Sequence, residues 1–142
     1  MQQVSRGAEA AWITLMRVTP ALVGRVERVL KKAGLPPLAW YDVLWELERA
    51  GHSVRQRDLA RGLLLARYSI SRLLDRLENE GLIERQECVG DARGQMLKLT
   101  RAGRSLRARM WPTYAAAIGA TIDDKLTRSE TLLLVRLLDK LR

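Results

Sequence analysis

The chain has 142 residues, of which 47% are hydrophobic, and a formal net charge of +9 at pH 7. This length suits one compact core, and the hydrophobic content excludes a chain that stays unfolded. A single cysteine and a single histidine exclude an intrachain disulfide and a closed zinc site built from Cys and His ligands.

The cysteine count favours a reducing compartment, and we expect a cytoplasmic protein. The longest stretch without a charge, Met110 to Ile122, has 13 residues and contains Pro112, so it is too short to span a bilayer. Arg6 and Glu9 fall where a secretory signal peptide would need an apolar core, so we expect no such signal.

Apolar residues recur at helical spacing in the first third of the chain. The apolar stripe runs from Trp12 to Ala33, includes Val29 and predicts a helix that is kinked at Pro20 and ended by Gly34. The alternative is that Thr19 caps a new helix with Pro20 at its first position. A second helix is predicted over Leu38–Ala50, with Gly51 as its stop.

The middle of the chain changes its periodicity. A short third helix is predicted from Arg55 to about Leu63 and a fourth over Arg67–Glu80. In Leu82–Cys88 and Gln95–Thr100 the apolar spacing is close to two, with Ile83, Leu97 and Leu99 as the expected inward positions, and glycines lie between these segments. This pattern predicts a β-hairpin with a charged tip.

Two further helices are predicted after the hairpin. Thr100 can cap the fifth helix, which we expect to bend at Pro112. Thr127 and Glu130 have the spacing of a capping box and predict the start of the sixth. The predicted fold class is therefore mostly α, with six helices and one β-hairpin.

Short helix, turn, helix and hairpin is the order of a winged helix-turn-helix, which places its second helix in the DNA major groove. In the fourth helix we expect four apolar residues to point inward: Ile70, Leu73, Leu74 and Leu77. The side chains left to face base edges are Arg67, Tyr68, Ser69, Ser71 and Arg72. From Arg55 to Arg109 there are 13 cations and seven anions, so this segment carries most of the positive charge. The alternative is an exposed helix whose arginines are only solvated.

The sequence resembles the MarR family of bacterial transcriptional regulators. The segments that carry the resemblance are Arg57–Ala60, Ser69–Glu78, Glu80–Arg85, Asp91–Arg93 and Leu97–Gly103, in the family's order and spacing over nearly the whole chain. The resemblance implies a homodimer on a pseudo-palindromic operator. It assigns residues 38–100 to the winged helix and residues 1–35 and 101–142 to dimerisation helices, and it implies that small aromatic acids act as inducers.

The resemblance also places Arg55, Arg76 and Arg93 where phosphate or minor-groove contacts form. Arg93 lies in the predicted hairpin tip, from which a guanidinium can enter a narrow minor groove. Asp91 is expected to orient Arg93 or Arg76 through an ion pair. The alternative for this tip is a polar loop without a role in DNA binding.

Six of the seven aromatic residues lie in the first, second and fifth predicted helices. Five of them, with Arg17 as partner for a carboxylate, are candidates to bind a small aromatic carboxylate: Trp12, Trp40, Tyr41, Trp111 and Tyr114. The sixth is Trp45. The alternative is ordinary core packing by these rings.

No feature of the sequence indicates an enzyme or a cofactor. The glycines form no phosphate-binding loop, and His52 has no acid and nucleophile at an informative spacing. Cys88 is either a structural thiol or, if exposed near Arg85, a redox-sensitive one.

Two classes of function remain. The first is a sequence-specific, ligand-responsive regulator, with repression as the expected mode. The second is a basic architectural protein that coats DNA without sequence preference and without a ligand response.

Overall fold

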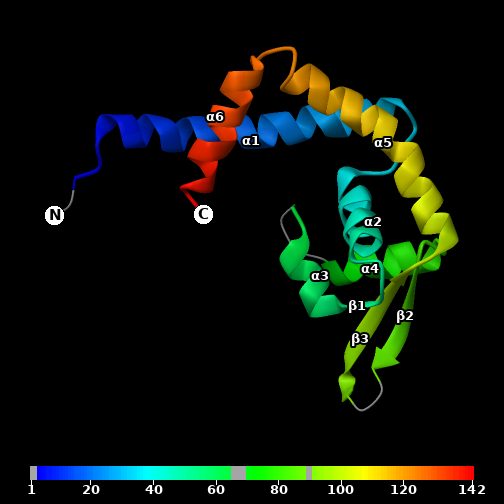
Figure 1. The fold of residues 1–142 in the computed structure, drawn as a ribbon. Coiled ribbons are helices and arrows are strands. Elements are labelled where there is room, and N and C mark those ends of the chain that lie inside the picture. Colours follow the sequence, from blue (N-terminus) through cyan, green and yellow to red (C-terminus); the bar gives the residue numbers. More distant parts are fainter. Residues whose placement is uncertain (1–2, 65–69, 89–90) are drawn as a thin grey trace. The chain divides into compact units, whose positions relative to one another are not determined.

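The computed structural model describes residues 3–64, 70–88 and 91–142, without the side chains of residue 88 and residues 91–93. The chain forms two compact units (Figure 1). Unit 1 comprises Met1–Ala33 and Thr113–Arg142, and unit 2 comprises Gly34–Pro112.

Unit 1 begins with the long helix α1, Arg6–Lys32. The Ser5 hydroxyl caps it by accepting a hydrogen bond from the Ala8 amide at 3.1 Å. The helix is continuous through Pro20, and Gly34 follows its end with a φ of 71°, a left-handed conformation that glycine adopts without strain. The helix and its glycine stop are therefore confirmed.

Helix α5, Arg101–Thr121, supplies its last turns to unit 1, and α6, Arg128–Asp139, completes that unit. The predicted capping box of α6 is confirmed. The Thr127 amide donates to the Glu130 carboxylate at 2.9 Å, and the Glu130 amide donates to the Thr127 hydroxyl at 3.2 Å. The Thr127 backbone hydrogen bond lowers the pKa of Glu130, so this cap is lost only as pH falls through that lowered value.

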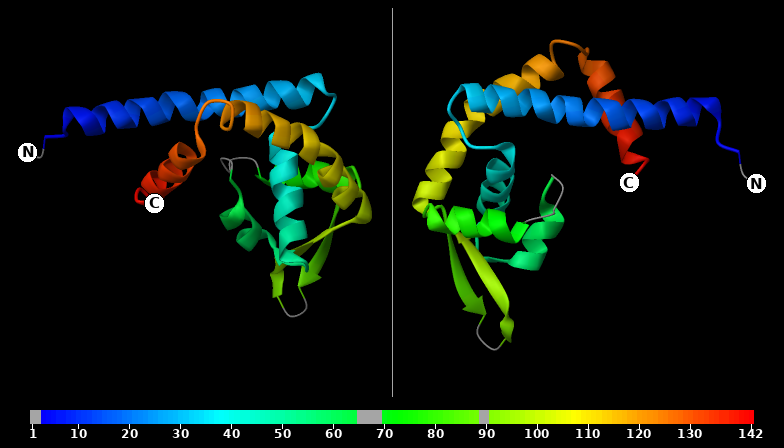
Figure 2. Two further views of the ribbon diagram at one scale, coloured as in Figure 1. Left: turned by 45° about the horizontal axis from the view of Figure 1, so that its top comes forward. Right: turned by 180° about the vertical axis from the view of Figure 1, so that it is seen from behind.

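Unit 2 contains the predicted helices and hairpin. Its helices are α2 (Leu38–Ala50), α3 (Gln56–Gly62) and α4 (Ile70–Asn79), and its strands are β1 (Val54–Arg55), β2 (Ile83–Cys88) and β3 (Asp91–Leu99). The antiparallel sheet has the order β1-β3-β2, and Figure 2 shows the β2–β3 hairpin extending from the rest of this unit.

The core of unit 2 is aliphatic. Its most deeply buried side chains come from every helix and long strand of the unit: Val43, Leu44, Leu59, Leu74, Leu77, Ile83, Leu97 and Met110. The expected inward positions Leu74, Leu77, Ile83 and Leu97 are thus confirmed, while Ile70, Leu73 and Leu99 are half-buried.

Three details differ from the predictions. Strand β1 was not predicted, because a strand of two residues shows no alternation of apolar and polar residues. Val54 in this strand pairs with Leu97. Because Arg55 belongs to the strand, α3 begins at Gln56 rather than at the predicted Arg55. Strand β3 begins at Asp91 rather than Gln95, so much of the predicted tip is strand, and a shift in register lies between Glu87 and Cys88. In unit 1, Val29 was expected inside but is 41% exposed.

The start of α5 is packed tightly against the hairpin. The Thr100 hydroxyl donates to the Gly81 carbonyl at 2.7 Å and accepts from the Gly103 amide at 3.0 Å, as the predicted cap requires. Gly103 is buried, and a Cβ there would overlap the Leu82 carbonyl oxygen and lie 2.7 Å from a methyl of Leu99. Only glycine therefore fits at this crossing.

We expect Gly103→Ala to lower the free energy of unfolding by about 1 to 3 kcal/mol, because the new methyl overpacks a backbone contact. Gly7→Ala is the matched control, since a Cβ at Gly7 of α1 meets nothing within 4 Å. Chemical denaturation of both variants at one protein concentration is the measurement. Equal stability of the two variants would contradict the steric argument.

Candidate nucleic-acid interface

Helix α4 divides its residues between the core and the surface. Leu74 and Leu77 are fully buried, while Ser71 and Arg72 are exposed. Arg67, Tyr68 and Ser69 lie outside the described residues. The described part of α4 therefore has the apolar anchor and the polar outer face that a helix in a DNA groove requires.

A buried carboxylate fixes the segment that leads from α3 toward α4. Asp42 of α2 is only 6% exposed, and its Oδ2 accepts a hydrogen bond from the Leu64 amide at 2.8 Å. The Leu64 side chain itself is 81% exposed. The bond therefore holds the backbone of this segment rather than a side chain.

Asp42 was not among the residues predicted from the sequence. The available signal was an acidic residue on the inward face of α2, between Tyr41, Val43 and Leu44, which are also buried. A charge at such a position must be paired or hydrogen-bonded, because its desolvation is otherwise costly.

Helices α2 and α3 approach each other closely at Gly62. A Cβ at Gly62 would lie 2.7 Å from the Glu46 carboxylate, which itself accepts a hydrogen bond from Arg49 at 2.9 Å. This hydrogen bond raises the pKa of Arg49.

Strand β1 places Arg55 beside β3, opposite Met96. Arg55 is half-buried at the edge of a groove of about 410 Å³ that also includes His52 and Asp58. The Nδ1 atom of His52 lies 2.8 Å from the Ser53 carbonyl oxygen and must be its donor, because a carbonyl only accepts. His52 is thus engaged locally.

Arg85 of β2 joins the β2–β3 hairpin, which we call the wing, to α4. Its Nη1 donates to the Asp75 carboxylate at 2.6 Å and lies 3.9 Å from a Glu78 oxygen. The Arg85 side chain is 18% exposed and the Asp75 side chain 60%, so solvent reaches the pair from the side of the carboxylate. The carboxylates of α4 thus orient an arginine of β2. The side chains of Asp91 and Arg93, which were expected to pair in the tip, lie outside the described residues.

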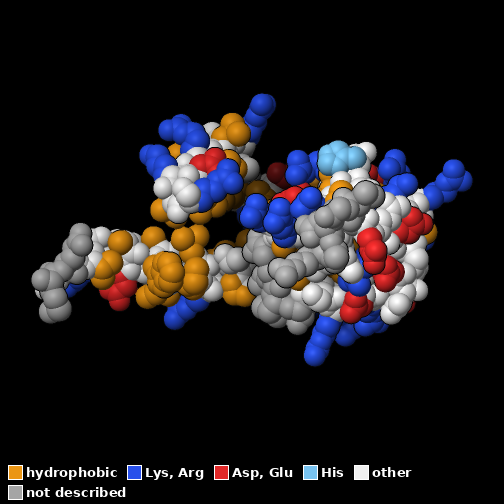
Figure 3. All heavy atoms as spheres, turned by 90° about the horizontal axis from the view of Figure 1, so that it is seen from below, with side chains coloured by type: hydrophobic (Ala, Val, Ile, Leu, Met, Phe, Trp, Pro, Cys, Tyr) orange, Lys and Arg blue, Asp and Glu red, His pale blue; other side chains and the backbone are white. Residues whose placement is uncertain are grey.

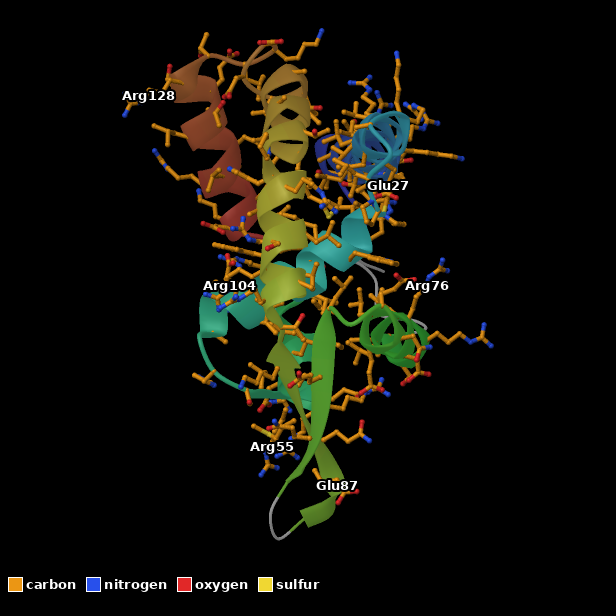
Figure 4. The ribbon with its side chains drawn as sticks, turned by 90° about the vertical axis from the view of Figure 1, so that its right-hand side faces the viewer. Glu27, Arg55, Arg76, Glu87, Arg104 and Arg128 are labelled. Carbon is orange, nitrogen blue, oxygen red and sulfur yellow. The ribbon has the colours of Figure 1, made fainter. Side chains whose placement is uncertain are left out.

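Arg76 contacts an aromatic ring. Its guanidinium carbon lies 5.8 Å from the ring centroid of Trp40 on α2, within the range of a cation–π contact. Figure 4 shows Arg76 on α4 and Arg55 beside the strands, well separated from each other. The structure therefore does not bring these two candidate phosphate ligands together.

The aromatic candidates for ligand binding are divided between the two units. Trp12, Arg17 and Tyr114 belong to unit 1, where Trp12 is 63% exposed and Arg17 is exposed. Trp40, Tyr41 and Trp111 belong to unit 2, where Tyr41 stacks on Trp111 with centroids 6.0 Å apart and planes at 22°.

Trp45 has a structural partner on α5. The guanidinium carbon of Arg107 lies 5.3 Å from its ring centroid, and Arg107 Nε is 2.8 Å from a Glu48 oxygen. That N–H is not aligned as a hydrogen-bond donor, so the contact is an ion pair only. This cation therefore braces α5 against α2.

Two other kinds of feature concern the described residues 3–64, 70–88 and 91–142. No group of three or more His, Cys, Asp or Glu side chains is placed to hold a metal ion there. No helix in the same ranges combines the length and apolar character needed to cross a membrane.

Comparison with known proteins points to one family. Residues 33–94 match a family model described as MarR family. A helix-turn-helix-type transcriptional regulator of Bacillus cereus is 31% identical over 129 residues, which cover 91% of this chain and 84% of the relative.

Two solved structures resemble the chain over almost its whole length. A MarR family transcriptional regulator from Streptomyces coelicolor in complex with DNA is 24% identical, with a TM-score of 0.84, covering 99% of this chain and 89% of that one. The structure of NadR in complex with 4-hydroxyphenylacetate is 29% identical, with a TM-score of 0.70, covering 99% and 98%.

We expect Asp42→Ala to lower the free energy of unfolding by about 2 kcal/mol and to accelerate hydrogen exchange at the Leu64 amide, because the buried donor loses its acceptor. Asp42→Asn keeps an acceptor oxygen and should fall between wild type and Asp42→Ala in both measurements. An unchanged exchange rate at Leu64 in Asp42→Ala would show that this hydrogen bond does not hold the segment.

Proposed function

The chain belongs to the MarR family of DNA-binding transcriptional regulators, and we propose that it is a sequence-specific repressor that binds a pseudo-palindromic operator as a homodimer. The observation that carries this proposal is the outer face of α4, where Ser71 and Arg72 are exposed above the buried Leu74 and Leu77. The DNA complex of the Streptomyces coelicolor relative supports the same mode of action.

The proposed interface separates two tasks. The residues proposed to read base edges are Arg67, Tyr68, Ser69, Ser71 and Arg72, because the first turns of a recognition helix reach the major-groove floor. Arg55, Arg76 and Arg93 are proposed to contact phosphates or the minor groove, contacts that position the protein but carry less sequence information.

A homodimer is proposed because unit 1 exposes an apolar surface larger than monomeric proteins usually leave in water. Hydrophobic side chains gather on the N-terminal half of α1 and along one side of α6 (Figure 3). The exposed hydrophobic residues in the N-terminal half of α1 and in α6 are Trp12, Ile13, Met16, Val18, Leu132, Leu133, Leu134, Val135, Leu137 and Leu138. Pairing with a second copy would remove this surface from water.

A response to a small aromatic carboxylate is proposed on chemical grounds. NadR binds 4-hydroxyphenylacetate, and this chain has the stacked pair Tyr41 and Trp111, and Trp40 beside Arg76. Such a ligand can change DNA affinity only if it binds the DNA-competent and incompetent states differently.

Alanine variants of Arg67 and Arg55 should lose DNA affinity in different ways. Arg67→Ala should cost about 1 to 3 kcal/mol on an operator selected from random duplexes and much less on scrambled DNA, because it removes a base contact. Arg55→Ala should weaken both complexes equally and reduce the slope of log affinity against log salt by about one unit. Binding isotherms on both duplexes at several salt concentrations are the measurement. Equal loss on both duplexes for Arg67→Ala would favour a DNA-coating protein instead.

Light scattering should give twice the chain mass of 16.1 kDa at micromolar concentration. Leu133→Glu with Leu137→Glu should give the monomer mass, since both side chains are 48% exposed in the single chain and buried charges oppose pairing. Arg136→Glu, a charge change on the same helix, is the control and should stay dimeric. A monomeric wild type would contradict the dimer.

Titration with 4-hydroxyphenylacetate should change the tryptophan fluorescence and lower the operator affinity over the same concentration range. Trp40→Leu should abolish or weaken both responses, because it removes one proposed ligand contact. If no acid in a panel of small aromatic acids changes the tryptophan fluorescence or the operator affinity, the ligand proposal is contradicted and the aromatic rings serve only core packing.

A further inference from the structure

Unit 1 contains a groove that the proposed DNA interface and the aromatic residues do not use. It has a volume of about 350 Å³ and lies between the C-terminal half of α1 and the last turns of α5. Its lining is Arg25, Arg28, Val29, Lys32, Ala117, Ala120 and Thr121. Such a volume is at the lower end of the range of small-molecule sites.

Three cations form one rim of this groove. Arg25, Arg28 and Lys32 are spaced by three and four residues, so they lie on one face of α1, and all three are exposed. Within the described ranges of the chain, none of them forms an ion pair. Like charges at this spacing repel each other and destabilise a helix unless an anion lies between them. Lys32 is also favourable at the helix C-terminus by itself, so Arg25 and Arg28 are the informative pair.

The floor of the groove is apolar. Val29 lies within the row of cations and is 41% exposed, and Ala117 and Ala120 face it from α5. The Thr121 hydroxyl donates to the Ala117 carbonyl at 2.7 Å, so it offers a ligand only an acceptor. All side-chain donors that line the groove are therefore cationic.

We propose that this groove binds a small organic phosphate with a compact apolar body. Two arginine forks and a lysine match the several oxygens and double charge of a phosphate monoester better than a single carboxylate, which one fork satisfies. Val29 and the two alanines contact the apolar body. The site shares no residue with the candidates for the aromatic carboxylate.

The test is calorimetric titration of the full chain with phenyl phosphate at low ionic strength, without DNA. We expect saturable binding of one molecule per chain. Inorganic phosphate and phenol should each bind at least about tenfold more weakly, because each lacks half of the proposed contacts. Because DNA is absent, the result is independent of the regulatory function proposed above.

Variants locate the binding. Arg28→Gln should weaken it about tenfold or more, while Arg6→Gln, the same charge loss on α1 outside the groove, should leave it unchanged. Ala120→Leu should also weaken it by filling the exposed part of the floor without altering charge, and circular dichroism checks that each variant folds. Equal loss in Arg28→Gln and Arg6→Gln, no effect of either groove variant, or no binding of phenyl phosphate would overturn the proposal.

Discussion

The hydrogen bond between Asp42 and the Leu64 amide is the constraint on which the proposed recognition helix, α4, depends. This hydrogen bond holds the backbone just after α3, at the end of the described segment that leads toward α4. A carboxylate that is 6% exposed supplies this hold, and its burial makes the bond worth more than one at the surface. Arg85 supplies a second hold by joining α4 to the first strand of the wing. The two contacts therefore join α4 and the segment after α3 to the rest of unit 2.

Much of the fold could be predicted because its signals are local. Leu38–Ala50 is a helix whose apolar spacing and glycine stop are both visible in the sequence, and the box at Thr127 and Glu130 is a fixed pattern. Strand β1 could not be predicted, since Val54 is a strand residue only through its pairing with the distant Leu97. The role of Asp42 was not predicted for the same reason, because its hydrogen bond is to a residue 22 positions away in the sequence.

The candidate site was harder to predict because arginines of equal charge have different tasks. Arg107 is held by Glu48 and Trp45, and Arg85 by Asp75, so both serve the scaffold. Arg72 is exposed on α4, and Arg76 lies over Trp40. The sequence shows that the segment from Arg55 to Arg109 is basic. Only the partners of each guanidinium distinguish an arginine that joins two elements of the scaffold from a candidate DNA ligand. The same distinction separates Tyr41 and Trp111, which stack on each other, from the exposed Trp12.

The strand order β1-β3-β2 leaves β2 at an edge of the sheet, with backbone groups that another chain could pair with. Its sequence, IERQEC, places Glu84, Gln86 and Glu87 in solvent along that edge. Charged side chains on an edge strand make pairing with a strand of another chain unfavourable, and the register shift between Glu87 and Cys88 interrupts the regular ladder. The exposed edge of the β2–β3 hairpin is thereby a poor template for pairing with a strand of another chain.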